Sequence, residues 1–182
     1  MLANTNIMLG KRMHLPLKLH PDCRCDAVDT ITVGVERGAD GLSLRYEVAG
    51  RIADLLLPAW TLPARADGLW QHSCFEAFVR QGEGEAYAEF NFAPSTEWAA
   101  YRFAGYRSGM EDLDVAPPSI ETHEEPARYE LRASIGLPRG SVRLGLSAVI
   151  EERSGRKSYW ALAHPAAKPD FHHPDAFTCE LA

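Results

Sequence analysis

The chain has 182 residues, which is enough for one domain with a sizeable core and does not require two. Hydrophobic residues make up 46% and charged residues 24%, values that argue against a disordered or fibrous protein. The 25 acidic and 19 basic side chains give a net charge of −6, which disfavours nucleic acid and anionic membranes as partners because both attract cationic proteins.

The amino-terminal residues lack the basic start and the apolar run of a secretory signal. We therefore expect residues 1–12 to be a tag remnant or a disordered extension, with Met13 as the natural start. The longest strongly apolar stretch, residues 55–60, is far shorter than the ~20 residues of a membrane span and contains Pro58. These features predict a cytoplasmic protein with no membrane segment.

Short strands account for most of the remaining pattern. The clearest strand covers residues 42–48, where leucine, tyrosine and valine alternate with polar or small residues. Turns rich in glycine and proline separate the other candidates. We predict these further strands at residues 30–37, 73–80, 87–93, 98–103, 129–136, 142–151 and 159–163.

Evidence for helices is weak. No window of eleven or more residues has apolar residues at helical spacing and also lacks glycine and proline. We expect at most one helical turn, at residues 108–114. Residues 105–125 contain two adjacent prolines and six acidic residues, which predicts a long surface loop followed by an exposed edge strand. The whole pattern predicts an all-β fold, a single antiparallel, jelly-roll-like β-sandwich over residues 13–182 with little helix.

The strand at residues 73–80 carries apolar side chains on both faces and Glu76 in its middle. It should be a central strand, in which a buried carboxylate must be paired or hydrogen-bonded. The next strand places Glu89 and Asn91 on the face opposite two phenylalanines. Arg132, on a later strand, is the predicted partner of Glu76 or Glu89.

Polar side chains on one sheet face, flanked by Trp70, Trp98 and Trp160, are typical of sugar recognition. Aromatic rings pack against the C–H surface of a pyranose, while carboxylates, amides and arginine bind its hydroxyl groups. The alternative is that Glu76 and Arg132 form a structural ion pair and that the tryptophans belong to the core.

Cysteine and histidine provide the candidates for a metal site. Cys23 and Cys25 could form half of a zinc site, but no second pair with suitable spacing follows, so reduced thiols are the simpler interpretation. Three histidines and two aspartates lie within residues 164–175 in a spacing that matches no metal signature. Phe171 and Phe177 in the same region are predicted to anchor a loop.

Several of these segments together resemble the DOMON-like proteins, which are related to the family 9 carbohydrate-binding modules. The resemblance rests on residues 69–78 (LWQHSCFEAF), residues 87–95 (YAEFNFAPS), Trp160, and the closing residues 170–172 with Phe177. It implies a β-sandwich that binds sugars or, in other branches, haem, usually without catalysis. The positions that match the ligand face are Trp70, Glu76, Glu89, Asn91 and Trp160, and His172 matches the histidine of the closing segment.

Two departures from the family pattern concern ligand binding. Ser73 replaces an acidic residue that often precedes the central strand, which puts a calcium or sugar contact there in doubt. Haem ligation in this superfamily calls for a methionine and a histidine, and Met110 is the only methionine after Met13. A pair of histidines from His164, His172 and His173 is the other way in which haem could be held.

Three functions of different classes follow. The first is a non-catalytic β-sandwich that binds a saccharide or another small polar ligand without a cofactor. The second is a glycoside-acting enzyme with Glu76 and Glu89 as paired carboxylates. The third is a haem or divalent-metal carrier. For the first function, the predicted ligand-binding residues are Trp70, Glu76, Glu89, Asn91, Trp98, Arg132, Trp160 and His172.

Overall fold

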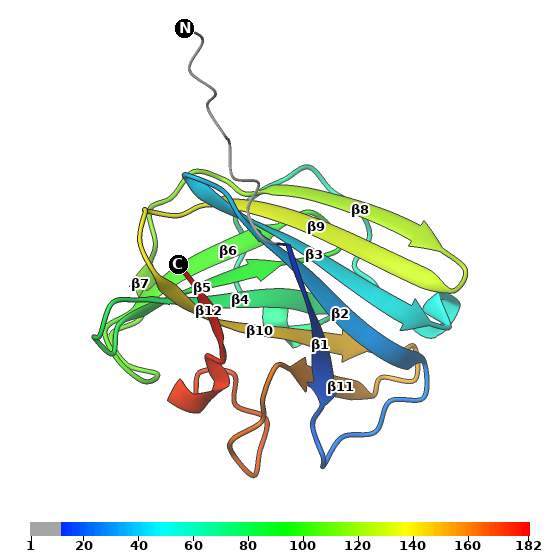
Figure 1. Ribbon diagram of the computed structural model, residues 1–182. Helices are drawn as coiled ribbons and strands as arrows, with labels where there is room; N and C mark the ends of the chain where they lie inside the picture. The colour runs from blue at the N-terminus through cyan, green and yellow to red at the C-terminus, as the bar shows by residue number, and fades with distance from the viewer. Residues whose placement is uncertain (1–11) are drawn as a thin grey trace, which may run out of the picture.

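Antiparallel strands build almost the whole of this computed structural model, which describes residues 12–182 (Figure 1). The expectation for residues 1–12 therefore concerns, apart from Arg12, residues outside this range. Three single turns of 3-10 helix interrupt the strands: η1 (Ile52–Asp54), η2 (Leu69–Gln71) and η3 (Pro174–Ala176). The twelve strands of this range are β1 (Met13–Leu19), β2 (Val28–Arg37), β3 (Gly41–Gly50), β4 (Cys74–Gln81), β5 (Tyr87–Phe92), β6 (Trp98–Phe103), β7 (Glu111–Asp112), β8 (Ser119–Glu125), β9 (Arg128–Gly136), β10 (Val142–Glu151), β11 (Lys157–Ala161) and β12 (Cys179–Leu181).

The strands form one curled sheet in the order β7-β6-β5-β4-β10-β11-β1-β2-β3-β9-β8, and β12 pairs with the start of β10. The curl produces two facing layers (Figure 1). We call β1, β2, β3, β9 and β8 sheet A, and the strands from β7 to β11 with β12 sheet B. Strand β1 joins the layers, because residues 13–17 pair with β2 whereas Lys18 and Leu19 pair with β11.

The core lies between the two sheets and follows the period of two seen in the sequence. Alternate residues of β3, from Leu42 to Val48, and of β10, from Leu144 to Ile150, are almost completely buried. The Tyr46 hydroxyl of sheet A donates a 2.7 Å hydrogen bond to the Glu76 carbonyl oxygen of sheet B. This bond satisfies the one polar atom that Tyr46 brings into the core.

The predicted all-β, sandwich-like fold is confirmed, and every predicted strand has a counterpart within a few residues. The edge strand expected at the end of residues 105–125 is β8, which pairs on one side only, with β9. The central strand with two covered faces is β4, in which Cys74 to Val79 are all buried. Glu76 lies in its middle.

Two local expectations were incomplete or wrong. Strand β1 was not predicted, although its leucines alternate with polar residues, because Pro16 cannot donate a ladder hydrogen bond and so argues against a strand. The helical turn expected at 108–114 is wrong: Glu111 and Asp112 form β7 against the edge of β6. Gly109, with φ near +62°, turns the chain into this short strand.

No helix of the described residues has the length and apolar character that a bilayer span requires.

Candidate functional site

The outer face of sheet B, which points away from the core, carries a row of polar side chains. The strand register places Glu76 of β4 opposite Ser147 of β10 and Asn91 of β5, so the three lie side by side across the sheet. The Ser147 hydroxyl donates to Glu76 Oε2 at 2.9 Å, and Asn91 Nδ2 donates to Glu89 Oε1 at 2.8 Å. Glu76 and Glu89 thus lie diagonally on neighbouring strands of one face.

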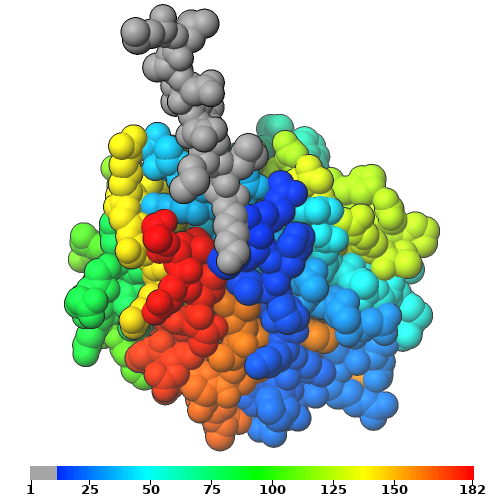
Figure 2. Space-filling model, viewed as in Figure 1, coloured from blue at the N-terminus to red at the C-terminus, as the bar shows by residue number. Residues whose placement is uncertain are grey.

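This face is buried because other parts of the chain cover it. Phe171 and Phe177, from the segment that follows β11, pack with Phe78, Tyr87 and neighbouring residues into a second apolar cluster outside the main core. Figure 2 shows the carboxyl-terminal residues, in orange and red, as a continuous band on one side of the molecule. The prediction that both phenylalanines anchor a loop agrees with these contacts. The polar row lies beneath that cover.

A cavity of about 390 Å³ remains between the sheet and its cover. Glu76 and Glu89 lie at its floor, and the carboxyl group of Glu76 is deeply placed, since the residue is only 2% exposed. Trp70, on η2, is 41% exposed and stands at the side. The remaining aromatic lining comes from Phe78, Phe103, Tyr159, Phe171 and His172.

Burial controls the charge of the groups in the cavity. It raises the pKa of Glu76 to about 8, helped by the negative charge of Glu89 and opposed by the bond from Ser147. Burial also raises the pKa of Glu89, although the bond from Asn91 and the charge of Arg107 oppose the shift. Burial and then the charge of Arg107 lower the pKa of His172 to about 4. At neutral pH, Glu76 is therefore largely protonated and His172 is uncharged.

A polar clasp closes one side of the cavity. The Arg107 guanidinium pairs with Asp170 at 2.8 Å, and the Asp170 carboxylate also accepts from the Tyr106 hydroxyl and from the His172 backbone N–H. Arg107 has φ near +51°, a left-handed conformation that is uncommon for a residue with a side chain. Its own N–H donates to the Tyr87 hydroxyl, which also hydrogen-bonds His172 Nδ1 at 2.8 Å. The clasp joins the β6–β7 loop to the carboxyl-terminal segment.

Four of the predicted site residues line the cavity: Trp70, Glu76, Glu89 and His172. Asn91 lies in the floor just beneath them, because it is fully buried and bonds Glu89. The structure therefore brings together five of the eight residues that the sequence predicted for the ligand site. They come from η2, two adjacent strands and the carboxyl-terminal segment.

The other two predicted tryptophans belong to the core and do not line the cavity. Trp98 occupies an inward position of β6, with the Arg65 guanidinium 4.7 Å from its ring centre. Trp160 packs in the same core, and its indole N–H donates to the Ser158 hydroxyl at 3.0 Å. Period two places both rings on the inner faces, since their neighbours in sequence point outward.

The predicted pairing of Arg132 with Glu76 or Glu89 is wrong. Arg132 lies on β9 of sheet A, facing away from the core, and its guanidinium binds Glu130 at 2.6 Å. Arg45 and Arg128 bind the same carboxylate. Alternation correctly took Arg132 out of the core but could not show which of the two outer faces it joins, because strand pairing is not local.

Sequence reasoning missed Arg107, Tyr159 and Met110, which also line the cavity. Tyr159 belongs to a predicted strand, so its outward position followed from the alternation. Arg107 and Met110 come from a loop without periodic pattern, and nothing in the sequence places that loop beside sheet B. Their role depends on the tertiary fold alone.

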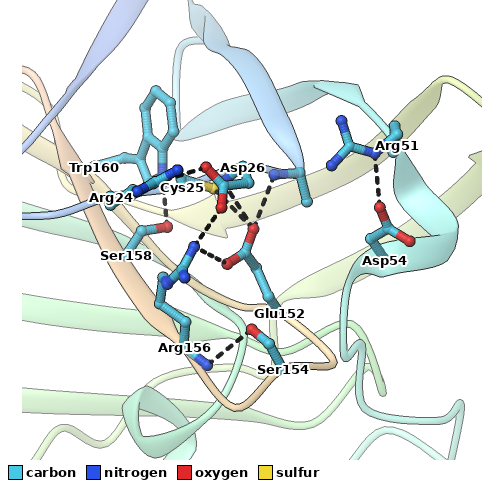
Figure 3. A network of polar contacts seen from close by, with 11 residues as sticks. Arg24, Cys25, Asp26, Arg51, Asp54, Glu152, Ser154, Arg156, Ser158 and Trp160 are labelled. Carbon is cyan, nitrogen blue, oxygen red and sulfur yellow. Dashed lines mark hydrogen bonds and ion pairs between the residues drawn. The ribbon is translucent and has the colours of Figure 1, made fainter.

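A second polar network, at the end of β10, shows a carboxylate with a full set of partners (Figure 3). Glu152 accepts backbone N–H bonds from Asp26 and Ala27 at 2.9 and 2.8 Å. Arg156 lies 3.4 Å from the other Glu152 oxygen and pairs with Asp26 at 2.7 Å. The network fastens the segment before β2 to the β10–β11 hairpin.

The histidines proposed as metal or haem ligands have separate partners. His164 Nε2 lies 2.7 Å from the Lys18 carbonyl oxygen, and the ring packs edge-on against His20. His173 Nδ1 accepts the backbone N–H of Asp175 at the start of η3, whereas His172 faces Tyr87. Within residues 12–182, no three side chains of histidine, cysteine, aspartate or glutamate gather in a metal-binding arrangement. All four cysteines of this range are free thiols.

Comparison with known proteins bears on the fold. The structure is similar to the crystal structure of a protein from Bacteroides uniformis ATCC 8492 described as a "putative carbohydrate-binding protein". The TM-score is 0.68 at 13% sequence identity, and the match covers 91% of this chain and 84% of the other. The two chains therefore share a fold. No model of a protein family matches the sequence, and no curated protein matches it.

Proposed function

We propose that the protein binds a saccharide, or another small polar ligand of that size, in the cavity on the outer face of sheet B and does not transform it. The main support for this proposal is a cavity of about 390 Å³ that combines a half-exposed tryptophan with buried polar groups. Binding sites for small molecules have this composition, with mostly apolar walls and a few fixed polar groups. Trp70 would stack on a sugar ring, and Glu76 and Glu89 would bind its hydroxyl groups.

Two further observations support this proposal. The Bacteroides uniformis protein with the same fold is described as a "putative carbohydrate-binding protein", which is consistent with a sugar ligand. Of the six positions that the DOMON-like resemblance implies, Trp160 lies in the core and five gather at the cavity: Trp70, Glu76, Glu89, Asn91 and His172. Membership of the DOMON-like group stays part of the proposal.

The test is a binding screen with a matched pair of tryptophan variants. A glycan array followed by isothermal titration calorimetry should identify a saccharide that binds the wild-type protein. Trp70→Ala should weaken that binding about fivefold or more, since stacking on an aromatic side chain contributes roughly 1–3 kcal/mol. Trp60→Ala, which removes a tryptophan that is 66% exposed and does not line the cavity, should leave it unchanged.

Two results would contradict the proposal. One is the absence of binding to every sugar on the array, and the other is an equal loss in both tryptophan variants. A thermal-shift measurement accompanies each titration, because specific binding raises the apparent stability of the folded state.

Glycoside hydrolysis is the second candidate, and the charge state of the carboxyl pair favours it. Glu76 holds a proton at neutral pH beside Glu89 on the same face, an arrangement suited to a general acid and a partner carboxylate. The expected result is release of nitrophenol from nitrophenyl glycosides by the wild-type protein and loss of that release in Glu89→Gln, which removes the partner carboxylate. Rates equal to the uncatalysed reaction with all such substrates would remove this candidate.

A further inference from the structure

The five glutamates that the structure buries most deeply differ in their counter-charges. Glu130 is bound by three arginines and Glu152 by Arg156, whereas Glu151 has the imidazole of His72 at 2.8 Å as its hydrogen-bond partner. Within residues 12–182, the carboxyl groups of Glu76 and Glu89, the two at the cavity floor, are hydrogen-bonded only by the neutral side chains of Ser147 and Asn91. Buried carboxylates in proteins are normally paired. The cavity floor therefore has no directly bound cation among residues 12–182.

The groups that face this floor do not supply it. His172 Nε2 lies 3.7 Å from Glu89 Oε2, but this imidazole is uncharged at neutral pH. Arg107 acts on Glu89 from a distance and is itself neutralised by Asp170. Tyr101, on β6, donates at 2.6 Å to Asp67, and Tyr87 bonds His172. Tyr159 of β11, Cys74 of β4 and Tyr46 of β3 are further titratable groups nearby, and none of them is a cation at any pH.

We propose that the ligand carries a protonated amine and that Glu76 and Glu89 bind its ammonium group, which makes amino sugars with a free amine the ligand class. This inference rests on the proposed function and specifies it. Glu76 Oε1 has no hydrogen-bond donor within residues 12–182, so it is free to accept one N–H. Glu89 Oε2 faces only the neutral His172 and can accept a second.

The cavity walls suit the same group. Phe78 and Phe103 both contact the His172 ring, with centroids 5.1 Å apart in each case, and all three line the cavity. The faces of aromatic rings attract cations, and the attraction is strongest where water is excluded. Aromatic lining and carboxyl groups in one cavity both favour an ammonium group over a hydroxyl group, which gains only the hydrogen bonds.

Proton release provides an independent readout. An ammonium ion favours the ionised form of the carboxyl groups, so its binding must lower their pKa and expel a proton from Glu76 at neutral pH. A neutral sugar has no such effect. The heat of binding of an amine will therefore change with the ionisation enthalpy of the buffer, and that of a neutral sugar will not.

The experiment uses matched sets of three sugars at pH 7: D-glucose with D-glucosamine and N-acetyl-D-glucosamine, and the corresponding galactose set. Calorimetry in two buffers measures affinity and proton release for each. In at least one set, the free amine should bind about tenfold or more tightly than its parent and its acetamide, since hydrogen bonds to charged groups are stronger than those between neutral groups. Only the amine should release a proton.

Glu89→Gln keeps the size of the side chain and removes one charge. It should abolish the preference for the amine, because the amine loses more affinity than the parent sugar does. Glu36→Gln, on sheet A and paired with Arg12, is the matched control and should keep the preference.

Each outcome decides a different question. If a parent sugar or an acetamide binds as tightly as the amine, or if the amine binds without proton release, the amine proposal is contradicted and sugar binding stands. If no sugar of either set binds and the wider array is also negative, both proposals are contradicted.

Discussion

Glu76 and Glu130 occupy similar places on the two sheets, each on the outer face of a strand that is paired on both sides. Around Glu130, hydrogen bonds from Arg45 and Arg132 outweigh the effect of burial and hold its pKa below its ordinary value. Around Glu76, burial is not opposed by any cation and raises the pKa to about 8. One carboxylate is paired by its own sheet, and the other is kept neutral.

The covers of the two faces explain this difference. The outer face of sheet A is open to solvent, and Arg132 there has a side chain that is 57% exposed. Such a face tolerates charge because water and neighbouring ions screen it. The outer face of sheet B lies under the carboxyl-terminal segment and the residues around η2, so the same residue type must lose its charge or bind an external partner. The covered outer face of sheet B can therefore bind a ligand, whereas the charged groups on the outer face of sheet A pair with one another and stabilise the fold.

The largest expected effect is the change in the free energy of unfolding with pH that Glu76 causes. Glu76 is protonated in both states below pH 4.5, only the unfolded chain ionises between 4.5 and about 8, and both states ionise above that. Wild-type stability must therefore fall across this window, by up to about 5 kcal/mol. Urea unfolding of the wild-type protein and of Glu76→Gln from pH 4.5 to 9 measures this loss. It is the change with pH in the difference between their free energies of unfolding. A difference that stays constant with pH would refute the pKa assigned to Glu76.

The next effect tests whether the cover of sheet B is a true second core. Phe78 is 1% exposed and packs against Phe171, Phe177 and His172. Phe78→Ala should lower the free energy of unfolding by about 3–5 kcal/mol, as for a phenylalanine in the main core. Chemical denaturation measures this value. A loss below about 1 kcal/mol would mean that the cover adds little packing.

A smaller effect is expected at Glu130. Glu130→Gln removes the charge that three arginines share, at a cost of about 1–2 kcal/mol because those arginines are partly exposed. The pKa of Glu130 is lowered, so this contribution is present above pH 4.5 and is lost as the pH falls below it. Denaturation at pH 7 and pH 3 should therefore show a difference between the two proteins only at the higher pH. An opposite pH trend would break the contrast with Glu76.

The smallest effect tests the corrected position of Arg132. Arg132→Ala should change stability by less than about 0.5 kcal/mol and should leave sugar affinity unchanged, since the residue is half-exposed and belongs to the other sheet. Titration calorimetry and urea unfolding give both values. A loss of binding would place Arg132 at the ligand after all.

The alternation in the sequence was sufficient to predict eight strands and the orientation of most side chains in them. It placed Glu76, Glu89 and Asn91 correctly, since each lies in a strand whose other face is strongly apolar. The predicted ligand role of Trp98 and Trp160 was wrong because it rested on the residue type, whereas the period of two places both rings in the core. In both cases the local pattern was a better guide than the chemical type of the residue.

The sequence by itself determined the all-β class, the central position of β4 and the presence of two carboxyl groups on one face, because a period of two is a property of neighbouring residues. Only the tertiary structure decided that Arg132 belongs to sheet A, and that Arg107 and His172 meet beside Glu89. These placements depend on which strands pair and where the carboxyl-terminal segment returns, and such contacts join residues far apart in the chain. They determine whether a buried carboxylate has a counter-charge, and so where a ligand can bind.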